Sequence, residues 1–443
     1  MKRAYAETGL HRGFRLGKLG FSLTGSYLGY QLQNLFLNAE NRDERRKSFE
    51  TKTSRKLREE LQSLKGPAMK IGQALSMQSH LLPEGVIKEL ANLQMRAPAM
   101  HPSLARAQFK ASFGKFPEDV YRDFAPEPFA AASLGQVHRA VTKAGEQVAV
   151  KIQYPAIRSA IENDFKMLRS TAFLGRLTGH IPGPVITELE QGILQETDYL
   201  AEADNIDFFR ERLKPLPYVK VPGVFRQLST DRVLTMTHLD GEPLMEFLAR
   251  KPTYEVRNLV GARLMALFIY QAHTVNAIHA DPHPGNYLID ASGAIGLVDF
   301  GCVKKFSPRI IEMNQCFRDH IWTKGEEQGR RILSLACGPE IFKRPRVAKR
   351  VLKDAIDLQQ MLFPWPPPAR NIVDFSDGNV LKQCAEIGNR NFRDKLMYPE
   401  FVFSSRAELG LFNVLHLLGA KLDLAAIEAE LNSLAAREPA NVL

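Results

Sequence analysis

The sequence predicts an α+β protein, and three observations lead to that expectation. Residues 129–155 read as small residues followed by two strand-like runs around a turn at 143–146, the signature of a hairpin. The loop HADPHPGNYLID at 279–290 ends in the strand-like run Tyr287–Ile289. Most of the remaining chain reads as helix, and its 443 residues suffice for two or three domains or for one large bilobal enzyme.

The composition is that of a globular protein with an anionic partner. The chain is 44% hydrophobic and 24% charged, and its formal net charge is +10, which suits nucleotide, nucleic acid or a phospholipid surface. Nucleic acid is the least favoured of these because no recognition motif is present. The four cysteines stand singly, so we expect buried structural thiols in a reducing compartment rather than zinc or disulfides.

The N-terminal segment Leu19–Leu37 is apolar and is preceded by a basic, acid-poor stretch. Its two glutamines and one asparagine make it a weak candidate for a membrane span. An interfacial anchor, a transit peptide and a helix packed on its neighbours all remain open. The pair Gly25 and Gly29 allows a close helix contact, and therefore a homodimer.

A charged helical stretch follows at about 40–120, and one of its helices has an apolar stripe at steps of three and four: Leu61, Leu64, Ala68, Ile71 and Leu75. Lys70 and Gln73 share a different face, so the helix presents a cation and an amide together. A solvated face is the alternative interpretation.

The predicted hairpin suits a polyphosphate. The small residues AAASLG at 130–135 let a backbone approach phosphates closely, and Lys151 at the end of VAVK can reach them as a point charge. An ordinary turn and an ordinary lysine at a strand end are the alternative interpretation. We expect one helix over Pro184–Leu213 in which Glu196 lies on the apolar stripe. A carboxylate there is buried and needs a cation, for which Lys151 is the first candidate. Asp198 or Glu202 could hold the lysine instead, and solvent exposure is the alternative for both.

Further along the chain, short strands are expected near Val219–Val224, Arg232–Thr237 and Ile295–Val298, and a helix over Tyr254–Ala277. In the loop that follows this helix, Asp281 can accept or orient the proton of an attacking hydroxyl. Asn286 and Asp299 supply the hard oxygen ligands that magnesium prefers. His279 is expected to pack behind the loop without a chemical role.

These motifs together resemble the UbiB family of protein-kinase-like proteins over about residues 50–420. The family's K-x-G-Q motif matches Lys70–Gln73, and its alanine-rich nucleotide loop matches residues 130–137. Its E-x-D motif matches Glu196–Asp198. The loop HADPHPGN and the sequence VDFG at 298–301 match the kinase catalytic loop and D-F-G elements.

The resemblance implies a bilobal kinase-like fold with an N-terminal helical extension across the active site. The expected segments are 1–40 as a basic and apolar stretch, 41–125 as the K-x-G-Q extension, 126–240 as the N-lobe with a helical insert, and 241–443 as the C-lobe. Asp281 and Lys151 are expected to be catalytic, and Asn286 and Asp299 to bind Mg²⁺. The expected residues for ATP or ADP are Ala130, Ala132, Ser133, Gly135, Val137, Lys151, Glu196 and Glu202. The expected occluding residues are Lys70, Gln73, Glu196 and Asp198.

The family implies an ATP-hydrolysing atypical kinase that supports ubiquinone biosynthesis at a membrane. Expected partners are nucleotide, anionic membrane or lipid quinone precursors, and coenzyme Q biosynthetic enzymes. A nucleotide-bound scaffold and a small-molecule phosphotransferase are the alternatives. The expected location is the cytoplasmic side of a bacterial inner membrane, with the matrix side of the mitochondrial inner membrane as the alternative.

Overall fold

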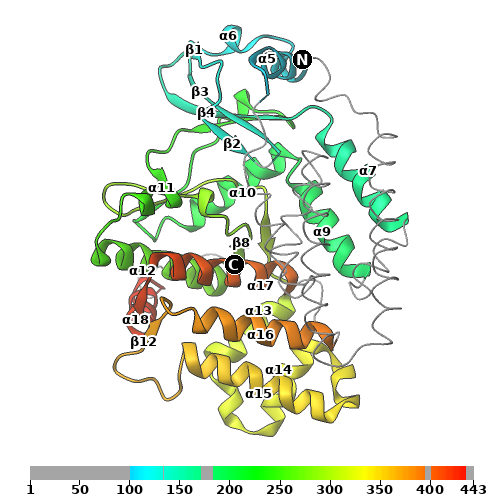
Figure 1. Ribbon diagram of the computed structural model, residues 1–443, viewed down its shortest axis with the longest axis vertical. Helices are drawn as coiled ribbons and strands as arrows, with labels where there is room; N and C mark the ends of the chain where they lie inside the picture. The colour runs from blue at the N-terminus through cyan, green and yellow to red at the C-terminus, as the bar shows by residue number, and fades with distance from the viewer. Residues whose placement is uncertain (1–99, 133, 171–182, 395–400, 436–443) are drawn as a thin grey trace, which may run out of the picture. The chain divides into compact units, whose positions relative to one another are not determined.

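A computed structural model describes residues 100–132, 134–170, 183–394 and 401–435 of the chain (Figure 1). Ser133, Lys70, Gln73 and the segment Leu19–Leu37 therefore lie outside the described residues. The described residues form two compact units. The first unit ends at Ala201 and also includes Phe225–Met236, and the second unit comprises Glu202–Val224 and the chain from Thr237 onwards.

The first unit contains a five-stranded sheet in the order β1-β3-β4-β6, with β2 also paired to β3, and the pairs β1–β3, β2–β3 and β3–β4 are antiparallel (Figure 1). Its elements are α5 (Pro102–Phe113), α6 (Pro117–Val120), β1 (Asp123–Phe124), β2 (Ala130–Ala132), β3 (Gly135–Val141), β4 (Gln147–Gln153), α7 (Ile157–Ser170), α9 (Gly183–Gln195), η2 (Arg226–Leu228) and β6 (Val233–Thr237).

The predicted hairpin is confirmed, with β3 and β4 paired from Gly135 opposite Gln153 to Val141 opposite Gln147. The turn is closed by hydrogen bonds from the backbone N–H of Thr142 to the carbonyl of Glu146 and from Gly145 back to Thr142, both at 2.9 Å. Gly145 has φ +96°, a conformation that side chains disfavour. A glycine at this position is therefore what lets the two strands join through so short a turn.

The prediction of one helix over Pro184–Leu213 is wrong, because the chain breaks after α9 and restarts as α10 (Tyr199–Arg212). The break coincides with the E-x-D residues. The carboxylate of Asp198 accepts hydrogen bonds from the backbone N–H groups of Leu200 and Ala201, each at 3.1 Å. An aspartate that satisfies the first N–H groups of a helix marks a helix start, which is the local reason for the break.

The second unit combines short strands with helices, and the core of its fold is helical. One sheet has the order β5-β10-β9-β7, with β5 parallel to β10, and two further strand pairs are β8 with β11 and β12 with β13. The strands are β5 (Val219–Lys220), β7 (Glu242–Pro243), β8 (Ala277–His279), β9 (Tyr287–Ile289), β10 (Ile295–Leu297), β11 (Val303–Lys305), β12 (Ile372–Asp374) and β13 (Lys421–Asp423).

The helices of the second unit include α11 (Leu244–Ala249), α12 (Tyr254–Tyr270), α13 (Pro308–Arg318), α14 (Glu326–Cys337), α15 (Pro345–Leu362), α16 (Asn379–Arg393), α17 (Phe401–Leu418) and α18 (Leu424–Ala435). Helical turns lie at η3 (Gln271–Val275), η4 (Pro284–Asn286), η5 (Ile321–Lys324) and η6 (Pro339–Lys343). The helix α12 packs against α17 and α18, and α14 lies beside α15 (Figure 1).

The helix predicted to reach Ala277 ends earlier. The helix α12 stops at Tyr270 and is followed by a π-helical turn, η3, that closes at Asn276 with φ +54°. The side-chain oxygen of Gln271 accepts a hydrogen bond from the backbone N–H of His279 at 2.8 Å. This contact joins the last residue of β8 to the turn, so the strand that leads into the HADPHPGN loop is fixed to the end of α12.

The thiols behave as predicted: none is in a disulfide, Cys302, Cys316 and Cys384 are buried, and Cys337 is partly buried. In the part of the chain that the structure describes, no helix has both the length and the apolar character needed to cross a membrane.

The substitution Gly135→Ala tests the packing of the hairpin. A Cβ added there would lie 2.3 Å from the carbonyl oxygen of Ile152, so Gly135→Ala must displace backbone of β4. We expect a loss of about 1–3 kcal/mol in the free energy of unfolding, seen as a lower midpoint in thermal unfolding. Gly388→Ala in α16 is the control, because nothing lies within 4 Å of the added Cβ there. Its midpoint should stay equal or rise, and equal midpoints for both variants would contradict the expectation.

Candidate functional site

The residues predicted to bind nucleotide in the first unit lie in two rows across its sheet. Ala130 is paired with Val137, and Val137 with Lys151, across β2, β3 and β4. Ala132 is paired with Gly135 in the next row on the same side. Directly opposite residues in antiparallel strands project from the same face. The register therefore places small side chains beside Lys151. Small side chains leave room for phosphate groups to approach the backbone.

Lys151 is buried, with 3% of its surface exposed. Its ammonium lies 5.1 Å from the centre of the Tyr199 ring, and Tyr199 is itself fully buried at the start of α10. A desolvated ammonium over an aromatic face gains a favourable electrostatic contact. Tyr199 could not be selected from the sequence, because an aromatic residue after an acidic motif is ordinary helix composition.

The E-x-D segment is tied to the same sheet through its central residue. The side-chain amide of Gln153 donates to the carbonyl of Thr197 at 2.8 Å, and Arg158 donates to the Thr197 hydroxyl at 3.1 Å. Gln153 lies two residues beyond Lys151 on β4, so its side chain projects from the same face as the lysine. The segment is therefore anchored on the face of the sheet that carries Lys151.

Two carboxylates of this region are buried. Glu196 is 5% exposed, which confirms the burial expected from its place on the apolar stripe, and Glu202 is 1% exposed. Solvent exposure of Glu202, one of the two interpretations of the sequence, is therefore wrong. Glu202 lies on the buried face of α10, which also carries Tyr199, Ile206 and Phe209. The choice between these two glutamates as partner of Lys151 stays a prediction.

The catalytic loop lies in the second unit between β8 and β9. The backbone N–H of Ala280 donates to the carbonyl of Cys302 at 2.9 Å, which extends the β8–β11 pairing into the loop. The N–H of Val298 donates to the carbonyl of Asn286 at 3.0 Å. These two bonds bring the D-F-G segment alongside the loop, so that Asn286 lies next to the residue that precedes Asp299.

Asp281 is the centre of this loop and is 8% exposed. Its Oδ2 accepts a hydrogen bond from the side-chain amide of Asn286 at 3.0 Å, and the same amide reaches the Asp281 carbonyl at 3.2 Å. Its Oδ1 lies 2.6 Å from the guanidinium of Arg406 on α17. The carboxylate is thus contacted on both oxygens by buried donors.

Asp299 is held through its backbone. Its φ of +62° lies in the left-handed region, which aspartate tolerates better than most residues. The ring of His279 hydrogen-bonds to the Asp299 carbonyl at 2.8 Å and packs edge-on against Phe300. The amide of Asn205 donates to the Phe300 carbonyl at 3.0 Å. His279 therefore packs behind the loop, as the sequence predicts.

Asn286 and Asp299 have the donor chemistry that Mg²⁺ requires. Because the amide nitrogen of Asn286 is directed at Asp281, its amide oxygen is the atom that can face a cation. Asp299 adds carboxylate oxygens. His283 does not join them in this arrangement, because its Nδ1 accepts a hydrogen bond from the backbone of Gly285 at 3.0 Å. Within the described ranges, no group of three or more His, Cys, Asp or Glu residues is placed to hold a metal.

Burial also perturbs titratable groups beside the loop. In the turn before β8, burial lowers the pKa of His273 to about 4. On α17, burial raises the pKa of Glu408 to about 7. Both side chains are only partly buried by area, so each pKa shift describes the group's own surroundings rather than the hydration of the loop.

Arg406 is the site residue that sequence reasoning missed. It lies 125 residues from Asp281, and no spacing rule connects them. A usable signal was nevertheless present, because Arg406 and Glu408 are the only charged residues in the otherwise apolar and polar-neutral run 401–415. A cation within such a helix predicts a buried partner, although it does not identify that partner.

The first unit carries the alanine-rich strand and Lys151, and the second unit carries the HADPHPGN loop and the D-F-G segment, which are the motifs of a kinase-like protein. Residues 92–323 match the ABC1 atypical kinase-like domain. The chain belongs to this family, which confirms the resemblance to UbiB proteins and the expected kinase-like α+β fold. The K-x-G-Q extension stays a prediction.

The chain is similar to plant, cyanobacterial and mycobacterial proteins. It is 34% identical over 279 residues to the Arabidopsis thaliana protein ACTIVITY OF BC1 COMPLEX KINASE 7, chloroplastic, covering 61% of this chain and 40% of that protein. It is 29% identical to the Synechocystis protein sll1770, covering 83% of this chain and 61% of that protein. The chain thus matches less than two thirds of the length of either relative.

A solved structure from Mycobacterium tuberculosis, the complex of Rv3197 with erythromycin, is also similar. It has a TM-score of 0.54 and 25% sequence identity, and the match covers 83% of this chain and 92% of that one.

The contact behind Asp299 can be tested with His279→Leu. This change removes the donor to the Asp299 carbonyl while it keeps an apolar side chain against Phe300. We expect a loss of about 1 kcal/mol in unfolding free energy, because a buried carbonyl loses its hydrogen bond. Urea unfolding measures it. Gln383→Leu, at an exposed position within α16, is the control. Equal stability of the two variants would show that the contact is unimportant.

Proposed function

We propose that this protein is an atypical kinase with ATPase activity that binds Mg-ATP and supports ubiquinone biosynthesis at a membrane. The observation that carries the nucleotide part is the hydrogen-bonded arrangement of Asp281, Asn286 and the D-F-G segment in the second unit. Protein kinases use these residue types to orient the attacking hydroxyl and to hold magnesium on the phosphates.

The roles follow from the chemistry of each group. Magnesium, when bound, neutralises charge that develops on the phosphates. Asn286 and Asp299 would be its protein ligands. Asp281 would orient the attacking water or hydroxyl, and Lys151 would supply a point charge to the phosphates. In the first unit, the small side chains of Ala130, Ala132 and Gly135 would let backbone approach the nucleotide.

The membrane and quinone parts rest on the resemblance to UbiB proteins and on the positive net charge of +10. A surplus of lysine and arginine is attracted to anionic lipid headgroups. The Arabidopsis thaliana relative named above is called chloroplastic, which places a related protein in an organelle. We propose a peripheral position on a quinone-producing membrane for this chain, bacterial or organellar.

The proposal is tested by steady-state phosphate release from ATP, with and without Mg²⁺ and with and without anionic liposomes. Asp299→Asn should lower turnover at least ~100-fold, because it removes a charged ligand of the metal on the phosphates. Asp240→Asn is the control, since the Asp240 side chain is 100% exposed, and it should keep wild-type turnover.

Turnover that needs Mg²⁺ and Asp299 and rises on liposomes supports the proposal. Turnover equal in wild type and Asp299→Asn would refute it. Nucleotide binding without turnover would favour the scaffold alternative, in which the loop holds magnesium and nucleotide and gathers biosynthetic enzymes or lipids.

A small-molecule phosphotransferase is the second candidate, and one observation favours it: the similar mycobacterial protein was solved with erythromycin. In this case Asp281 would accept the proton of a hydroxyl on an organic acceptor. Incubation with Mg-ATP and erythromycin, followed by mass spectrometry, should then show one added phosphoryl group that is absent with Asp281→Asn. If no phosphorylated product forms, this support for the second candidate is removed.

A further inference from the structure

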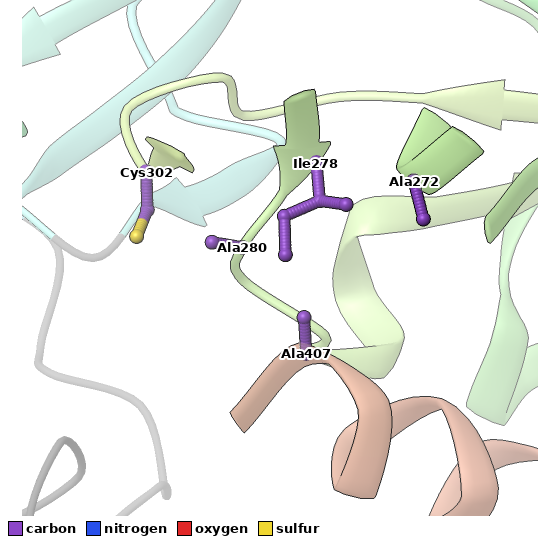
Figure 2. Packing of buried hydrophobic residues seen from close by; sticks show 5 residues of the cluster. All are labelled: Ala272, Ile278, Ala280, Cys302 and Ala407. Atoms are coloured by element: carbon purple, nitrogen blue, oxygen red, sulfur yellow. The ribbon is translucent and has the colours of Figure 1, made fainter. Parts of the chain in front are cut away.

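The helix α17 is pressed directly against the catalytic loop through small residues. Figure 2 shows Ala407 on α17 beside Ala280 in the loop, and both belong to a buried cluster with Ile278 and Cys302. Three residues further along α17, a Cβ added to Gly410 would lie 2.1 Å from Cγ of Pro282. Residues three apart share one helix face. That face therefore contacts the loop on both sides of Asp281.

This close approach brings Arg406 to the carboxylate between those two contacts. The guanidinium lies 2.6 Å from Oδ1 of Asp281, and the side chains of Arg406 and Asp281 are 4% and 12% exposed. Asn286 donates to Oδ2 at 3.0 Å. An aspartate carboxylate rotates easily about its last bond, because that torsion has only broad minima. Two donors, one on each oxygen, suppress this rotation.

We propose that Arg406 is a positioning residue that fixes the orientation of the Asp281 carboxylate for phosphate chemistry. This inference rests on the proposed function. A purely stabilising role explains the contact less well, because a buried ion pair is often no more stabilising than apolar side chains of the same volume. A planar guanidinium, by contrast, holds a carboxylate in a defined geometry. A misplacement of about 1 Å at a reacting group lowers turnover by as much as ~100-fold.

The test is a double-mutant cycle on steady-state phosphate release from Mg-ATP. The variants are Arg406→Met, Arg406→Lys, Asp281→Asn and the double variant Arg406→Met with Asp281→Asn. Arg406→Met should lower kcat roughly 10- to 100-fold, whereas KM for Mg-ATP should change less than about 3-fold. Arg406→Lys keeps the charge but not the planar fork, so it should recover part of kcat. The double variant should be no slower than Asp281→Asn alone, because Arg406 acts through Asp281.

Arg331 provides the matched control. It also lies 2.6 Å from a carboxylate, that of Glu312, but its side chain is 54% exposed. Arg331→Met should leave kcat and KM unchanged. Thermal unfolding of every variant, with assays run well below the lowest midpoint, separates turnover from folding. If Arg406→Met does not fold, Arg406→Lys and the double variant, which leaves no unpaired buried carboxylate, still decide the question.

A second readout does not depend on turnover. Hydrogen–deuterium exchange over residues 277–290 should be faster in Arg406→Lys than in wild type, and unchanged in Arg331→Lys. Unchanged exchange in the loop would overturn the inference, as would wild-type kcat in both Arg406 variants or losses that multiply in the double variant. If wild type released no more phosphate than Asp299→Asn, the proposed function would fail, while loop exchange would still decide whether Arg406 positions Asp281.

Discussion

The site in the second unit depends on one constraint: a carboxylate that is almost removed from water must accept hydrogen bonds from protein groups. Asp281 satisfies this constraint with Asn286 on one oxygen and Arg406 on the other. The first contact has a consequence for the neighbouring position. Because the asparagine amide is directed towards Asp281, its oxygen is left as the atom suited to a cation. The second contact requires α17 to lie against the loop, which only small residues at 407 and 410 permit.

In the first unit, the strand register determines which residues surround the buried ammonium group of Lys151. Lys151 is buried on a central strand, and the residues aligned with it on β2 and β3 are Ala130 and Val137. Small side chains at this place leave backbone accessible beside a cation, while Gln153 anchors the E-x-D break to the same face. A shift of one residue in the register would turn Lys151 to the opposite face. The observed register, from Gly135 opposite Gln153 to Val141 opposite Gln147, keeps Lys151 on the face that also carries Gln153.

Local patterns predicted the local structure, and tertiary contacts were beyond them. The hairpin and the catalytic loop were predictable because alternation, turn residues and prolines act within a few positions. The helix over 184–213 was predicted as continuous because the apolar stripe runs through the break. Asp198 was considered as a partner of Lys151 or as a solvent-exposed acid, and not as a helix cap. The end of α12 depends on a side chain, Gln271, that bonds to β8. Arg406 reaches Asp281 across 125 residues, and no periodicity encodes that distance.

The way Asp281 is held bears on which of the competing functions suits the chain. A scaffold that only retains nucleotide needs metal ligands and a cation, which Asn286, Asp299 and Lys151 can provide. Such a scaffold does not need a fixed orientation of Asp281. A reaction at a hydroxyl does need one, because proton acceptance depends on the direction from which the hydroxyl approaches the carboxylate. Burying an arginine in an apolar helix is costly unless the charge is paired well. That arrangement is therefore better explained by a reaction at Asp281 than by binding alone.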